Sequence, residues 1–144
     1  MTVLFMLLFA MIGAIIYAVV GTLWYSNSTP MGKIHMQYLG FDKLSDAEKK
    51  RKMEEAKPMM AKMYAAQIGL ALLTSFAVVF VVSLSIQNHV PPMVAIGFVL
   101  FNWLTFMVPI IGQGILWSNC DPKIAWKKFF SDSLSNLVSV LVIA

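Results

Sequence analysis

Residues 63–120 read MYAAQIGLALLTSFAVVFVVSLSIQNHVPPMVAIGFVLFNWLTFMVPIIGQGILWSNC and contain no Asp, Glu, Lys or Arg. A charged side chain at the centre of a bilayer costs roughly 2.5–3.5 kcal/mol on insertion scales, so a long charge-free apolar run is typical of membrane-spanning helices. The basic residues all lie on either side of this run, in 33–62 and 123–128. This distribution predicts an integral membrane protein.

The composition of the whole chain supports the same class. Hydrophobic residues make up 59% of the 144 residues, against about 45–50% in soluble domains. The length predicts a single domain, 1–144. The net charge of +4 does not indicate a nucleic-acid partner, because acidic residues are interleaved with the basic ones. We expect the basic residues to set the topology and to contact anionic lipid, so the bilayer is the predicted partner.

Four apolar segments are long enough to cross a hydrocarbon core of about 30 Å at 1.5 Å per residue. They run over about 3–24, 59–85, 92–117 and 123–144. The last is the least apolar, because it holds several serines, Asp132 and Asn136. The expected fold is all-α: a four-helix transmembrane bundle.

The basic residues also predict an orientation. Eight Lys and Arg lie between the first and second segments and three between the third and fourth, whereas the turn between the second and third has none. By the positive-inside rule both charged connections are cytoplasmic, so both termini are expected to be external.

The cytoplasmic segment 29–57 is predicted to form a helical hairpin. Thr29-Pro30 is a helix start, with an N-cap residue followed by Pro at the first helical position, and Gly40 is the expected end. Ser45 to Glu48 has the spacing of a capping box that opens a second, charged helix. Pro58 then either kinks the chain or begins the second span.

Polar side chains recur at helical spacing inside the spans and are expected to converge in the bundle, since they are costly in lipid. Either they hydrogen bond between helices, or they line a hydrated path for a small solute or ion. Asp132 is a candidate functional group, or else an anchor that pairs with Lys128 four residues earlier. The candidate path residues are Gln67, Asn102, Thr105, Gln113, Asp132 and Asn136.

Small residues recur every four positions in the first span, at Ala10, Ala14 and Ala18. Such faces let two helices approach closely. We therefore expect this face to pack within the bundle or between protomers.

No catalytic motif is present, neither His-Glu-x-x-His, Gly-x-Ser-x-Gly nor a phosphate-binding loop. The eleven methionines leave Cu(I) binding open, but Met also fills apolar helices and no dense Met-x-x-Met series occurs. We expect no enzymatic activity, no cofactor and no resident metal.

The chain resembles, along nearly its whole length, the small prokaryotic membrane proteins grouped as domain of unknown function 1761. The order and spacing of short motifs carry the resemblance: Trp24-Tyr25-Ser26, Pro30-Met31-Gly32-Lys33, Leu44-Ser45, Pro58-Met59-Met60 and Trp126 to Phe129. The resemblance implies a four-helix fold in a prokaryotic cell membrane. It implies no activity and transfers no functional residue.

Two functions are compatible with these patterns. One is a non-enzymatic membrane protein, as a homo-oligomer, that binds or passes a small solute or ion through its polar interior. The other is an accessory subunit packed against a larger membrane complex.

Overall fold

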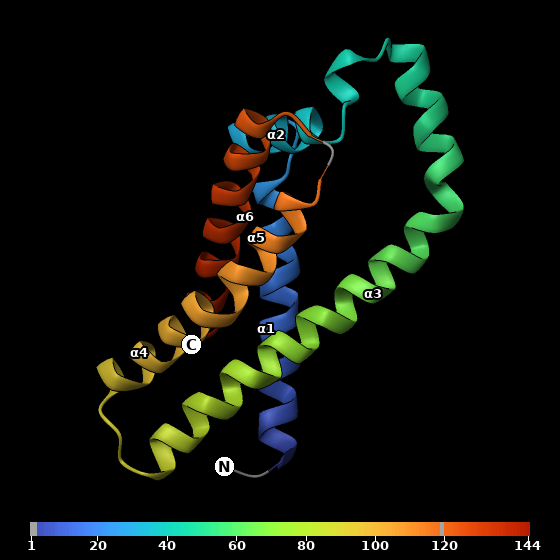
Figure 1. The fold of residues 1–144 in the computed structure, drawn as a ribbon. Helices are drawn as coiled ribbons and strands as arrows, with labels where there is room; N and C mark the ends of the chain where they lie inside the picture. The colour runs from blue at the N-terminus through green and yellow to red at the C-terminus, as the bar shows by residue number, and fades with distance from the viewer. Residues whose placement is uncertain (1–2, 119) are drawn as a thin grey trace.

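The computed structural model describes residues 3–118 and 120–144, which fold into helices joined by short connections (Figure 1). The elements in chain order are α1 (Val3–Trp24), α2 (Pro30–Tyr38), the 3-10 turn η1 (Phe41–Lys43), α3 (Asp46–Gln87), α4 (Pro92–Asn102), the π-helical segment η2 (Trp103–Met107), α5 (Val108–Leu116) and α6 (Pro122–Ile143). No strand occurs in these two ranges, so the predicted all-α class is confirmed.

Three helical stretches among the described residues are long and apolar enough to cross a membrane: Val3–Trp24, Asp46–Gln87 and Pro92–Leu116. This finding is compatible with a membrane protein. The fourth expected span corresponds to α6, which carries Lys123, Lys127, Lys128 and Asp132 in its first half. With those charges, α6 is not among the helices apolar enough to cross a membrane. The structure therefore supports the four-span bundle only in part.

Two predicted helix starts are confirmed. The Thr29 side chain accepts a hydrogen bond from the Gly32 N–H, and Pro30 opens α2. The Ser45 side chain accepts from the Glu48 N–H while the Glu48 carboxylate accepts from the Ser45 N–H, which completes the capping box of α3. After α2, Gly40 takes a left-handed φ of 72°, a conformation that glycine adopts without a Cβ penalty.

The second helix of the predicted hairpin is not a separate element. α3 is continuous from Asp46 to Gln87, with Pro58 inside it. Pro58 cannot donate to the carbonyl of Glu54, but both residues are exposed, so water can satisfy that oxygen. At 1.5 Å per residue, α3 is about 63 Å long, roughly twice a hydrocarbon core. Figure 1 shows its first part standing apart from the other helices.

The expected third span contains a π turn ahead of Pro109. The Val108 N–H donates to the carbonyl of Trp103, five residues earlier, and α5 then begins with Pro109 at its second position. A π turn moves the following residues around the helix axis, so it changes which side chains share a face.

The helices pack where α1, α3 and α6 cross. The buried residues there are small: Ala10, Gly13 and Ala14 of α1, Ser75 of α3 and Ser139 of α6. A small apolar cluster of Val78, Val99 and Val140 lies beside them. Of the predicted small face, Ala10 and Ala14 are buried and Ala18 is exposed, and the neighbouring Gly13 is buried as well.

Replacing Gly13 with Ala is expected to destabilise this crossing. A Cβ built on Gly13 lies 2.6 Å from Ser75 Oγ and 3.0 Å from Ile143 Cγ2. Overpacking of this kind costs about 1–3 kcal/mol. Unfolding of the purified protein in mixed micelles with rising SDS measures the loss. Gly21→Ala, on the same helix with nothing within 4 Å of its Cβ, is the control, and equal stabilities of the two variants would contradict the packing described.

Candidate functional site

A buried ion pair lies on α6, at the end of the structure where α6 begins. The Lys128 ammonium donates to both carboxylate oxygens of Asp132, one helical turn later. The Lys128 side chain is 8% exposed and that of Asp132 is 23% exposed. The pairing, one of the two alternatives that the sequence left open for Asp132, is therefore present in the structure. Burying two charges carries a desolvation cost that only good geometry and further hydrogen bonds offset.

The end of α1 supplies such hydrogen bonds. The Tyr25 hydroxyl donates to Asp132 Oδ1 at 2.5 Å. Trp24 Nε1 donates to the Ser131 hydroxyl at 3.1 Å. The end of α1 is therefore tied to the first half of α6 at two neighbouring residues.

A third hydrogen bond joins the same two helices further along. Asn136 Nδ2 donates to the Tyr17 hydroxyl at 2.7 Å. Tyr17 lies about two turns along α1 from Tyr25, and Asn136 lies about one turn along α6 from Asp132. The polar contacts between α1 and α6 are therefore spread along about two turns of α1.

Aromatic rings from α2 and from the end of α1 lie against the ion pair. Lys128 Nζ lies 4.9 Å from the ring centre of Tyr25 and 5.6 Å from that of Tyr38, both within the range of cation–π attraction. The His35 ring lies 5.1 Å from that of Tyr25. Figure 1 shows α2 lying across the end of α1 beside the start of α6. We call these side chains the ion-pair cluster: Tyr17, Trp24, Tyr25, His35, Tyr38, Lys128, Asp132 and Asn136.

The turn before α2 holds that helix in place. The Thr29 hydroxyl accepts from the Gly32 N–H at 2.9 Å and lies within donating distance of the Trp24 and Ser26 carbonyl oxygens, at 2.7 and 2.8 Å. A Cβ on Gly32 would lie 2.0 Å from the Ser26 carbonyl oxygen. Only glycine allows this close approach, so the motifs 24–26 and 30–33 act together to place Tyr25 and His35.

Two polar atoms in the ion-pair cluster are buried without a hydrogen-bond partner: His35 Nδ1 and Asn136 Oδ1. Burial, reinforced by the Lys128 charge and partly opposed by Asp132, lowers the pKa of His35 below its usual value. Burial, with the hydrogen bond to Asp132 next, raises the pKa of Tyr25. At neutral pH the His35 imidazole is therefore neutral and the Tyr25 phenol is protonated.

Acid is expected to destabilise the packing of α2 through His35. The folded pKa is below the unfolded value of about 6.5, so the unfolded state binds more protons and stability falls as the pH drops below that value, levelling off below the folded pKa. Unfolding midpoints in micelles between pH 8 and pH 5 measure this slope. His35→Gln should flatten it, whereas His89→Gln, at an exposed position outside the cluster, should not. Equal slopes for native protein and His35→Gln would refute the assignment.

Two of the six candidate path residues, Asp132 and Asn136, lie one turn apart in the ion-pair cluster. The other four are exposed on the surface of the single chain. Gln67 lies on α3, away from the cluster. Gln113 lines a groove of about 460 Å³ between α5 and the start of α6.

The remaining two, Asn102 and Thr105, hydrogen bond to their own helix, to the carbonyls of Phe98 at 2.8 Å and Phe101 at 2.7 Å. Asn102 also lines a groove of about 390 Å³ between α3, α4 and α6, together with Thr74 and Trp103. Within one chain, the structure brings two of the six residues together and leaves four apart.

The sequence did not indicate that the aromatic residues of the cluster belong to the site. In the sequence, Trp24 and Tyr25 stand out only as part of the motif Trp24-Tyr25-Ser26. Their partners lie more than a hundred positions away in the chain. One signal could have indicated the contact: Tyr25 and Asp132 both lie near the ends of their apolar segments that face the basic connections.

The described residues contain no group of three or more His, Cys, Asp or Glu side chains that could hold a metal ion. Within the ion-pair cluster, the buried polar atoms without a hydrogen-bond partner are His35 Nδ1 and Asn136 Oδ1. A small ion or polar solute could exchange with the Lys128–Asp132 contact, or hydrogen bond to His35 Nδ1 and Asn136 Oδ1.

One family model, described as "Protein of unknown function (DUF1761)", matches residues 8–144. No curated protein matches the chain, and no solved structure matches it.

Proposed function

This chain belongs to the DUF1761 family, and we propose that it is a non-enzymatic multi-pass membrane protein that binds or passes a small ion or polar solute. The observation that carries the proposal is the buried Lys128–Asp132 pair, with unpartnered polar atoms of His35 and Asn136 beside it. Burying an ion pair is rarely a gain in stability over apolar packing, and ionisable groups within membrane segments commonly mark ion or solute sites.

In this proposal the protein acts as a homo-oligomer. Gln67, Asn102, Thr105 and Gln113 are exposed on the single chain, and of these Gln67 and Gln113 have no side-chain hydrogen bond among the described residues, whereas Asn102 and Thr105 donate to their own helix. An amide facing hydrocarbon without a partner costs several kcal/mol. Contacts between copies remove this cost, because they bring these side chains against each other or against water enclosed between protomers.

Flux through liposomes containing the purified protein tests the proposal. We expect proton or K⁺ flux above that of empty liposomes, and a tenfold or greater loss in Asp132→Asn, which keeps the side-chain shape but removes the charge. Asp121→Asn is the matched control. Asp121 is an exposed acid that caps the start of α6, and an amide can still cap a helix. Flux that survives Asp132→Asn would exclude the site.

The second candidate is an accessory subunit of a larger membrane complex. It is favoured by the first part of α3, Asp46–Leu70, where nearly every residue is exposed. Absence of flux for protons, Na⁺ and K⁺ in the native protein, together with a stoichiometric co-purifying membrane protein, would favour this function over solute binding.

A further inference from the structure

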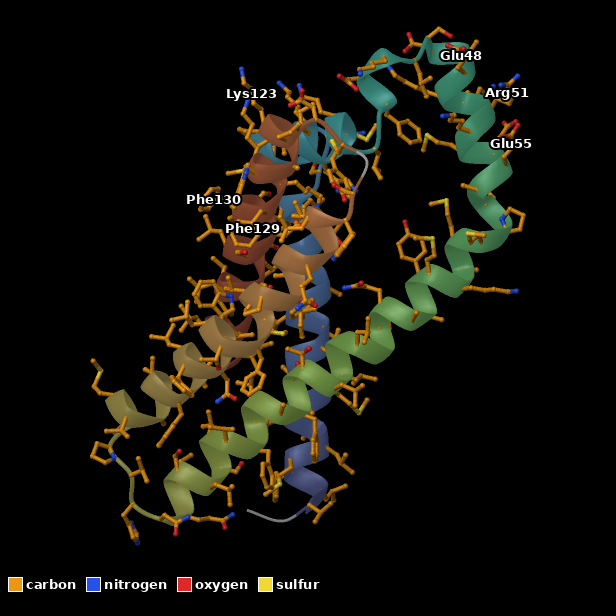
Figure 2. The ribbon with its side chains drawn as sticks, in the orientation of Figure 1. Glu48, Arg51, Glu55, Lys123, Phe129 and Phe130 are labelled. Atoms are coloured by element: carbon orange, nitrogen blue, oxygen red, sulfur yellow. The ribbon has the colours of Figure 1, made fainter. Side chains whose placement is uncertain are left out.

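Little of the first part of α3 is covered within the described chain, although Ala66, Gly69 and Leu70 line a groove shared with α1. Every residue of Asp46–Leu70 is exposed except Lys49 and Met60, which are half-buried. Figure 2 shows Glu48, Arg51 and Glu55 on this part of α3, apart from the other helices. Arg51 and Glu55 pair with each other at 3.5 Å, within the helix itself. Beyond this charged stretch, apolar side chains such as Met63 (63% exposed) and Leu70 (59%) are uncovered as well.

One side of this helix has the spacing of a helix–helix seam. Residues that are spaced alternately four and three positions apart lie on the same face of a helix. We call them the α3 seam: Ala56, Met60, Met63, Gln67, Leu70 and Thr74, of which Thr74 is half-buried and lines the groove beside Asn102 and Trp103. The seam is about 28 Å long at 1.5 Å per residue, close to the thickness of a hydrocarbon core.

Gln67 lies near the middle of the seam, five residues inside the charge-free run that begins after Lys62. No hydrogen bond of its side chain is found in the part of the chain that the structure describes. A carboxamide has both donors and an acceptor, so two glutamines can satisfy each other. A single polar residue at such a position is known to fix register and partner number in paired helices.

We propose that the α3 seam is the contact between two copies of this chain, with the two Gln67 side chains hydrogen bonded to each other. Copies inserted in the same membrane have the same orientation, so a two-fold axis along the membrane normal makes the two α3 helices parallel. The self-complementary amide favours a second copy over an unrelated helix, and its cost in hydrocarbon disfavours lipid.

Charge limits the extent of the pairing. From Met63 onward the seam and its flanks carry no charged residue. Lys57 lies next to the seam at its charged end, and in a parallel pair it would approach basic residues of the other copy. The two helices are therefore expected to diverge beyond Ala56. This inference rests on the homo-oligomer of the proposed function, but not on solute passage.

Disulfide cross-linking in native membranes tests the pairing. In a Cys120→Ser background, Gln67→Cys should give a covalent dimer on mild oxidation, and Leu70→Cys, one seam position further, should do the same. Ala65→Cys is the control, since Ala65 is exposed but lies about 200° around the helix from Gln67. Light scattering of the detergent-extracted native chain is measured in parallel.

A dimer from Q67C and L70C but not from A65C supports the pairing. Equal cross-linking of all three, or a Q67C cross-link only to a different protein, overturns it. An oligomer by light scattering without the Q67C and L70C dimers overturns the α3 pairing alone. A monomer by light scattering overturns both the pairing and the homo-oligomer of the proposed function.

Discussion

Replacing Asp132 with Ala is expected to lower the free energy of unfolding by about 3 kcal/mol, the lower end of the range for breaking a buried ion pair. The change leaves the Lys128 ammonium, 8% exposed, without its carboxylate. It also removes the acceptor of the Tyr25 hydroxyl. SDS-induced unfolding in mixed micelles at pH 7 measures the difference.

Two further variants show whether this loss of stability comes from the unpaired charge of Lys128. The double variant Lys128→Met/Asp132→Asn removes both charges but keeps an acceptor for Tyr25, so it should recover most of the stability. Lys127→Met, one position away and exposed, should change stability by less than about 0.5 kcal/mol. A loss below about 1 kcal/mol in Asp132→Ala would mean that water, rather than protein, already solvates the pair.

Replacing Gly32 with Ala is expected to displace α2 and to cost about 2–3 kcal/mol. The added Cβ would meet the Ser26 carbonyl oxygen at 2.0 Å and its carbon at 2.6 Å, and backbone atoms cannot rotate away as a side chain can. Displacement of α2 should separate His35 and Tyr38 from Lys128 and open Lys33 to trypsin.

The comparison for Gly32 is Gly69→Ala, in the exposed part of α3 with nothing within 4 Å of its Cβ. There the change should be neutral or stabilising by up to about 1 kcal/mol, because alanine favours a helix over glycine. If Gly32→Ala keeps native stability and trypsin resistance, the turn is not what holds α2.

Local signals predicted the local structure well. The charge-free run marked the apolar helices, and the caps at Thr29 and Ser45 lie where residue type and spacing placed them. These features depend on neighbours within four positions. Pro58 left two alternatives open, a kink or the start of the second span, and in the structure it lies inside one continuous helix.

The candidate site was only half predictable for a physical reason. Lys128 and Asp132 lie one turn apart on the same helix, so their pairing follows from spacing. The contacts of Tyr25 with Asp132 and of Tyr17 with Asn136 depend on how α1 and α6 pack, and nothing local determines that. The π turn at Trp103–Met107 likewise changes which polar residues share a face, so a stripe counted on an ideal helix did not stay one stripe.

We propose that α6 crosses the membrane as a fourth span, so that the ion-pair cluster lies at the cytoplasmic end and both termini are external. The most direct test is labelling of intact cells with a membrane-impermeant maleimide. In a Cys120→Ser background, Ala144→Cys and His89→Cys should both be labelled, whereas Cys120 of the native chain should react only after the cells are opened. Protection of Ala144→Cys together with Cys120, while His89→Cys is labelled, would contradict the claim and leave three spans.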